Sequence, residues 1–160
     1  MEKRLGLGSP RPEFKRFSDP TRLVFNRAMD LAEMNHNNYA GDGHLLLALM
    51  KNDSVRDVLA KLNLSRKKIG RSLDYYMTRL MYEEFRGEVK LTDTVYAIIG
   101  FAEDEAKPGK KLPSPIDLLM GITREGNGIA ARALRENRLP EDPPLLDALR
   151  NAVSAGRLKS

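Results

Sequence analysis

Apolar residues recur at intervals of three and four along nearly the whole chain, which is the spacing of one face of an α-helix. The first half contains a long periodic segment, then a short and very apolar one, then two further amphipathic segments. Short polar residues that suit helix N-caps precede them. No five-residue window alternates as a half-buried strand does. The pattern predicts an all-α fold, with helices in the first half that begin at about Ser18, Gly43, Asp53 or Ser54, and Ser65.

The second half repeats the pattern of the first. Thr92 opens an apolar-periodic segment 74 residues after Ser18 does. The short apolar segment also recurs, since His44–Leu49 corresponds to Asp117–Ile122 at a separation of 73 residues. A drift of one residue is what loop insertions produce, so the chain contains a duplicated structural unit.

We therefore predict two tandem, pseudo-symmetric four-helix repeats packed together as one domain, with both short helices buried at the centre. Residues 17–85 form the first repeat and residues 91–154 the second. The stretch 86–90 is the joint between them. Residues 1–16 are basic and contain Gly and Pro, and we expect them to form a disordered lead-in.

Composition narrows the chemistry. The chain has no Cys, which excludes disulfides and thiolate metal sites. Its longest apolar run, Leu45 to Met50, is far shorter than the roughly 20 residues of a membrane span, so no membrane association is expected. The net charge of +5 permits weak attraction to nucleic acid or acidic partners. The densest basic group lies on one predicted helix and consists of Arg66, Lys67, Lys68 and Arg71. It is interpreted either as a solvated helix face or as a phosphate-binding surface.

The sequence predicts no catalytic residue, no metal site and no cofactor. The two histidines, His36 and His44, lie eight residues apart without a further soft ligand, so His44 is expected to bond to the backbone or to Asp42. The consecutive acids 103–105 point in different directions on a helix. The Tyr and Met residues between 75 and 82 are too many for one buried stripe, so we expect some of them at the surface or at the joint between the repeats.

Two motifs resemble the amino-terminal domain of the Clp unfoldases. The stretch HNNYAGDGHLLLAL, residues 36–49, is similar to a family pattern that is usually HN, a hydrophobic residue, then GTEHLLLGL. The stretch REGNGIAARAL, residues 124–134, is similar to the family's REGEGIAARVL. The resemblance spans about residues 17–153. It implies a duplicated four-helix module that docks adaptors and captures substrates in front of ATPase rings, or a free-standing accessory subunit of a Clp protease.

The resemblance does not extend to an ATPase. The only Gly-Lys pair, Gly109 and Lys110, lacks the earlier Gly and the following Ser or Thr of a phosphate-binding loop. We therefore expect a non-enzymatic docking module whose partners are Clp ATPase or peptidase subunits, adaptors or substrate proteins. The lack of Cys suits a reducing compartment, and we expect a cytoplasmic location, or the plastid stroma in a plant. The alternative is a basic helical nucleic-acid-binding protein.

The resemblance also implies a docking surface at the equivalent helix starts. In some relatives an acidic residue before the His of GTEH, together with a Thr that opens the first helix, recognises phosphorylated arginine. Here Gly43 and Ile116 stand at the acidic positions, so we expect little selectivity for phosphoarginine. The predicted partner-binding residues are Ser18, Asp19, Asp42, Thr92, Asp93 and Asp117.

Overall fold

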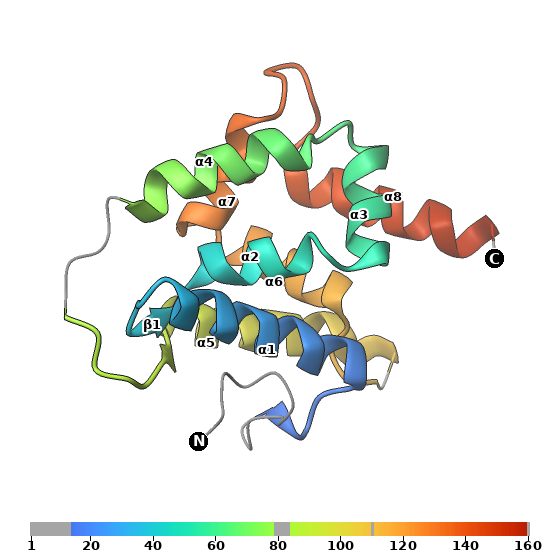
Figure 1. Ribbon diagram of the computed structural model, residues 1–160. Coiled ribbons are helices and arrows are strands. Elements are labelled where there is room, and N and C mark those ends of the chain that lie inside the picture. Colours follow the sequence, from blue (N-terminus) through green and yellow to red (C-terminus); the bar gives the residue numbers. More distant parts are fainter. Residues whose placement is uncertain (1–13, 79–83, 110, 160) are drawn as a thin grey trace.

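The computed structural model describes residues 14–78, 84–109 and 111–159. Eight α-helices make up most of these residues, in two consecutive sets of four (Figure 1). The first set is α1 (Asp19–Met34), α2 (Asp42–Leu49), α3 (Asp53–Lys61) and α4 (Arg66–Thr78). The second set is α5 (Asp93–Ala106), α6 (Pro115–Glu125), α7 (Ile129–Glu136) and α8 (Leu145–Lys159). The predicted all-α fold of two four-helix repeats is confirmed.

The helices form three levels in Figure 1. Helices α1 and α5 lie on one side, α2 and α6 lie in the middle, and the remaining four helices cover the other side. The middle pair is buried because the residues of α2 and α6 are apolar over most of their circumference. Leu46 and Leu119, at equivalent positions, are 0% and 1% exposed. Burial of such side chains is the main favourable term in folding, and it accounts for the central place of both short helices.

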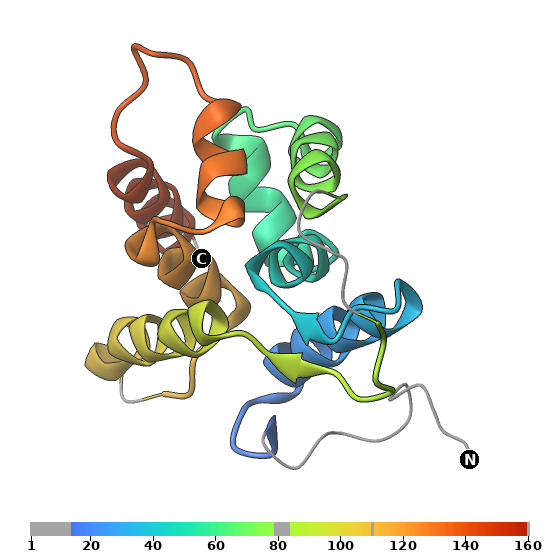
Figure 2. The same ribbon diagram turned by 90° about the vertical axis from the view of Figure 1, so that its left-hand side faces the viewer.

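The two repeats interlock. Helix α7 of the second repeat packs against α2 and α4 of the first, and α3 of the first packs against α6 and α8 of the second. Figure 2 shows α7 beside α4. Each repeat therefore completes its core with helices of the other. Gly121 of α6 allows a close approach to α5, because a Cβ there would lie 2.6 Å from the carbonyl oxygen of Ile98.

A short parallel strand pair joins the repeats, although the sequence predicted no strand. Strand β1 (Tyr39–Ala40) pairs with β2 (Lys90–Leu91), with Tyr39 opposite Lys90 and Ala40 opposite Leu91. Asn38 supports this joint, because its side chain donates to the carbonyl of Glu84 and accepts from the N–H of Arg86. Two-residue strands have no sequence periodicity of their own, which is why the pattern did not reveal them.

The packed part of the chain begins earlier than residue 17. Phe14 is 1% exposed, and its ring stacks on that of Phe25 in α1 at a centroid distance of 4.7 Å. Phe17 stacks on the same ring at 5.2 Å. The predicted lead-in therefore ends by residue 13, and the prediction of disorder for residues 1–13 lies outside the described residues.

Several helix starts differ by one or two residues from the sequence prediction. The short helix begins at Asp42 rather than at Gly43. Asn52, and neither Asp53 nor Ser54, caps α3, because its side-chain oxygen accepts the N–H of Val55. Asn is as good an N-cap as Asp or Ser, so local preference alone could not choose among three adjacent candidates.

Candidate docking site at the helix starts

The first turn of α1 has an exposed residue, Asp19, and a buried one, Thr21. Ser18 is the N-cap residue, and its hydroxyl donates to Thr21 at 3.4 Å rather than accepting a bond from the helix. Asp19 has a side chain that is 85% exposed, and it pairs with Arg22. Thr21 is fully buried, and its hydroxyl donates to the carbonyl of Pro113 at 2.8 Å. The first turn of α1 is therefore fixed to the loop that precedes α6 of the other repeat.

The start of α5 has the corresponding arrangement. The Thr92 hydroxyl accepts the N–H of Val95 at 3.2 Å and caps the helix. The N–H of Thr92 donates to the carbonyl of Ala40 at 3.2 Å, which fixes this turn beside the residues that precede α2. Asp93 is exposed. At both sites, one repeat supplies the long helix start and the other supplies the neighbouring short helix start.

The two remaining predicted residues, Asp42 and Asp117, are buried. Asp117 exchanges hydrogen bonds with the N-cap Ser114, since each side chain accepts from the other's N–H. Asp42 accepts the N–H of Ala130 at the start of α7 at 2.7 Å. Burial raises the pKa of the Asp42 carboxyl above its usual range, and the backbone hydrogen bonds oppose this effect. Both carboxylates hold helix starts in place, and neither is open to a partner in this structure.

Apolar side chains fill the space next to Gly43. A Cβ at this position would lie 2.7 Å from the sulfur of Met77 in α4 and 2.9 Å from the Cδ1 of Ile129 in α7. A longer acidic side chain would need both to move. The half-buried Ile116 stands at the equivalent position of the second repeat. The structure thus places no carboxylate at the two positions where the family pattern has an acid.

His44 is a structural residue. Its Nδ1 accepts the N–H of Gly41 at 3.1 Å, so Nδ1 carries no proton, and its Nε2 then donates to the Oδ1 of Asn37 at 3.1 Å. Burial lowers the pKa of the imidazole to about 4. The predicted backbone bond is present, while Asp42 bonds to α7 instead. Among the described residues, no group of three His, Cys, Asp or Glu side chains is placed to bind a metal ion.

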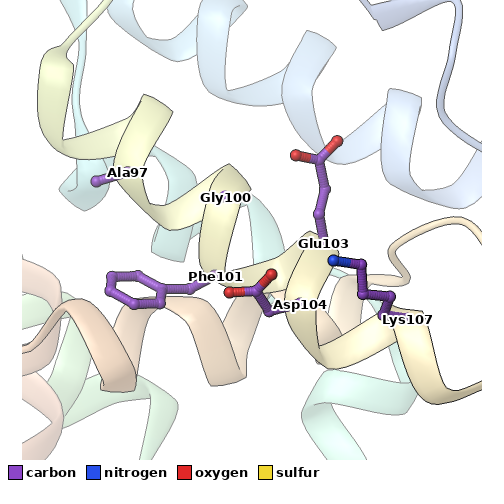
Figure 3. A pocket seen from close by; sticks show the side chains of 6 residues that line it. All are labelled: Ala97, Gly100, Phe101, Glu103, Asp104 and Lys107. Carbon is purple, nitrogen blue, oxygen red and sulfur yellow. The ribbon is translucent and has the colours of Figure 1, made fainter.

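The outer face of α5 contains a shallow hollow, shown in Figure 3. Its floor is Ala97 and Gly100, because neither has a side chain large enough to fill it. The half-buried Phe101 lies on one side, with the guanidinium of Arg124 over its ring at 4.7 Å. The same guanidinium donates to Glu105, which also binds Arg150 of α8. Of the three acids at 103–105, only Glu105 is part of this charged network, which joins α5, α6 and α8.

The aromatic residues near the end of α4 divide between surface and packing. Tyr75 is 56% exposed. Tyr76 is half-buried, with Arg132 of α7 over its ring at 4.5 Å, and its hydroxyl bonds to Glu136. The expectation that some of this group reach the surface holds for Tyr75, while Tyr76 packs where the two repeats meet; Met81 and Tyr82 lie outside the described residues.

Comparison with known proteins places this arrangement in a family. The model of the Clp repeat (R) N-terminal domain matches residues 16–137. The chain belongs to this family. A relative is the negative regulator of genetic competence ClpC/MecB of Bacillus subtilis (strain 168), which is 30% identical over 125 residues. That match covers 76% of this chain and 15% of the relative, so the Clp repeat domain described here spans a small part of the relative's length.

Solved structures show the same fold. The N-terminal domain of Hsp104 from Candida albicans superposes with a TM-score of 0.73 at 12% identity, over 88% of this chain and 91% of that one. The N-terminal domain of the caseinolytic protease associated chaperone ClpD from Arabidopsis thaliana gives 0.65 at 18% identity, over 96% and 100%. Because these identities are low, the likeness concerns the fold. No helix in the described ranges is long and apolar enough to cross a membrane.

Proposed function

We propose that this Clp repeat domain is a non-enzymatic docking module of a Clp unfoldase or protease system, working as an adaptor, accessory subunit or substrate receptor. Its partners are Clp ATPase or peptidase subunits, adaptors or substrate proteins. In this proposal it acts in the cytoplasm, or in the plastid stroma of a plant. The family membership supports a docking role, and the paired helix starts supply the surface.

The observation that carries the proposal is the exposure of two equivalent acidic helix starts on an interlocked frame. Asp19 and Asp93 are open to solvent in the first turns of α1 and α5, next to the hydroxyls of Ser18 and Thr92. Exposed carboxylates bind Arg and Lys side chains of a partner. The first-turn N–H groups of a helix lack intrahelical acceptors, so they can also donate hydrogen bonds to polar groups of a partner.

The buried Asp42 and Asp117 have a positioning role in this proposal. Asp42 fixes the start of α7 in the second repeat, and Asp117 fixes the start of α6 in its own repeat. The partner-contacting residues are then Ser18, Asp19, Thr92 and Asp93. With no carboxylate at positions 43 and 116, the site should bind unmodified protein segments with little selectivity for phosphorylated arginine.

The test uses NMR chemical-shift mapping of the 160-residue chain with a purified Clp ATPase subunit of the same organism and, separately, with free phosphoarginine. We expect shifts around residues 18–22 and 92–96 with the Clp subunit, and weak or no shifts with phosphoarginine. Binding should persist in moderate salt. Tight phosphoarginine binding, or Clp-induced shifts confined to residues 66–71, would contradict the proposed site.

A matched pair of variants sharpens this test. The double variant Asp19→Asn, Asp93→Asn should weaken binding of the Clp subunit by about tenfold, since each exposed ion pair contributes up to about 1 kcal/mol. The control is Asp53→Asn, Asp147→Asn, because these are also exposed aspartates in the first turns of helices, α3 and α8. Equal effects of the two double variants would show that net charge alone governs binding.

A further inference from the structure

The first half of α4 carries an unneutralised basic face. Between Asp57 and Asp74 the chain contains no acidic residue and five basic ones. Four of the five lie on α4, and all are exposed: Arg66, Lys67, Lys68 and Arg71. We call these four residues the α4 basic face. None of them forms an ion pair with any acid of the described ranges, although Asp74 stands only three residues after Arg71.

Local physical chemistry disfavours this arrangement. Three consecutive cations occupy the first turn of α4, where the partial positive charge of the helix end repels them. Lys67 and Arg71 are four residues apart, and like charges at that spacing destabilise a helix. The fold does not need the charges, because α4 is held by its opposite side through the buried Ile69 and Leu73. Departures from local preference without a structural gain occur at functional surfaces.

We propose that the α4 basic face is a second docking surface, which binds an acidic segment of a partner protein. The exposed Tyr75 lies nine positions after Arg66, which corresponds to about 14 Å of helix. An extended peptide covers that length with about four residues. The occupant is therefore an extended run of four or five residues with at least two Asp or Glu side chains, which guanidinium and ammonium groups bind by charge-assisted hydrogen bonds.

A protein segment fits this face better than a nucleic acid does. Single-stranded nucleic acid requires a basic track interleaved with several aromatic side chains on which bases stack. Tyr75 is the one exposed aromatic residue among those described on α4, and it also packs edge-on against Tyr76 at 5.5 Å. The short basic face matches a short acidic run, and not a long phosphate backbone.

The position of α4 makes this surface independent of the helix starts. Helix α4 belongs to the level opposite α1 and α5 in Figure 1, with α2 between them. A partner at the starts of α1 or α5 and an acidic segment on α4 can therefore bind together. The proposed function and this inference fail separately, because the first concerns residues 18–22 and 92–96 and the second concerns residues 66–75.

The test measures binding of a synthetic peptide with four Glu residues around one Leu to the full chain in 50 mM salt, by fluorescence anisotropy. The same peptide with Gln in place of Glu is the peptide control, and a ten-nucleotide thymidine oligomer is the competing ligand. We expect the Glu peptide to bind at least tenfold more tightly than the Gln peptide and the oligomer. Its NMR shifts should centre on residues 66–75.

Two double variants of equal charge decide whether the site is local. Lys67→Glu, Lys68→Glu should weaken binding of the Glu peptide by tenfold or more. Lys107→Glu, Lys111→Glu changes the net charge by the same amount at exposed lysines elsewhere and should leave the affinity within twofold. Equal losses in the two variants, or tighter binding of the oligomer than of the Glu peptide, would overturn the proposal. Circular dichroism spectra and thermal unfolding confirm that both variants fold.

Discussion

The carboxylate of Asp42 accepts a hydrogen bond from the backbone N–H of Ala130, which lies 88 residues further along the chain. Asp42 begins α2 of the first repeat, and Ala130 is in the first turn of α7 of the second. The N-cap residue of α7 is Gly128, which has no side chain to cap the helix. A Cβ at Gly128 would overlap the Asp42 carboxylate, so the glycine makes room for a cap supplied by the other repeat.

Replacement of Asp42 should test this interlocking bond. We expect Asp42→Ala to destabilise the protein by about 1–2 kcal/mol, the usual cost of removing an N-cap. Asp42→Asn retains a side-chain oxygen that can accept the N–H of Ala130 and removes a buried charge, so it should cost much less. Urea titrations measure both. Equal losses for Ala and Asn would show that the negative charge stabilises the contact and that the hydrogen bond does not.

The stability should fall as the pH decreases from about 6.5 to about 4 because of His44. Its pKa is about 4 in the folded protein, against 6.5 for an unperturbed imidazole. The unfolded chain therefore takes up the proton first, and the stabilisation is complete above pH 6.5 and lost on the way to pH 4. The shift corresponds to roughly 3 kcal/mol at most.

Urea titrations of the wild type and of His44→Gln across this range isolate the effect from that of Asp42, whose raised pKa acts in the opposite sense in acid. The difference in stability between the two proteins should narrow as the pH decreases. His36→Gln, in an exposed loop, controls for the loss of an imidazole at the surface. A constant difference between wild type and His44→Gln would contradict the lowered pKa of His44.

Truncation of the two central helices should have similar effects. Leu46→Ala and Leu119→Ala each remove a completely or almost completely buried side chain, and we expect each to cost about 2–5 kcal/mol. Leu139→Ala is the control, since this side chain is 62% exposed and should change the stability by less than about 0.5 kcal/mol. A near-neutral result at both central positions in a denaturant titration would show that the pair is not the core.

Two glycines should respond differently to a single methyl group. Gly121→Ala should destabilise more than Gly43→Ala, because the new Cβ would meet the backbone carbonyl of Ile98 in one case and the flexible Met77 side chain in the other. Overpacking typically costs about 1–3 kcal/mol. Adding Met77→Ala should recover part of the loss for Gly43→Ala and none for Gly121→Ala. Recovery in both cases would mean that the two contacts are coupled.

The amino-acid sequence alone was sufficient for the fold class and the duplication. Helical spacing of apolar residues depends on local geometry, so it is readable without any tertiary contact. The same is true of Ser18 and Thr92 as residues that open helices, because an N-cap preference acts within one turn. The predicted central place of Leu46 and Leu119 followed from segments too apolar to be exposed.

The tertiary structure decided what the side chains at the predicted site do. The sequence predicted that Asp42 and Asp117 contact a partner, yet Asp42 is engaged by α7 and Asp117 by its own N-cap. Contacts between distant residues also decide which repeat supplies the neighbour of each helix start. They decide too that Phe14 belongs to the core. Local preferences act over one helical turn, whereas a buried carboxylate is placed by the helix that packs against it.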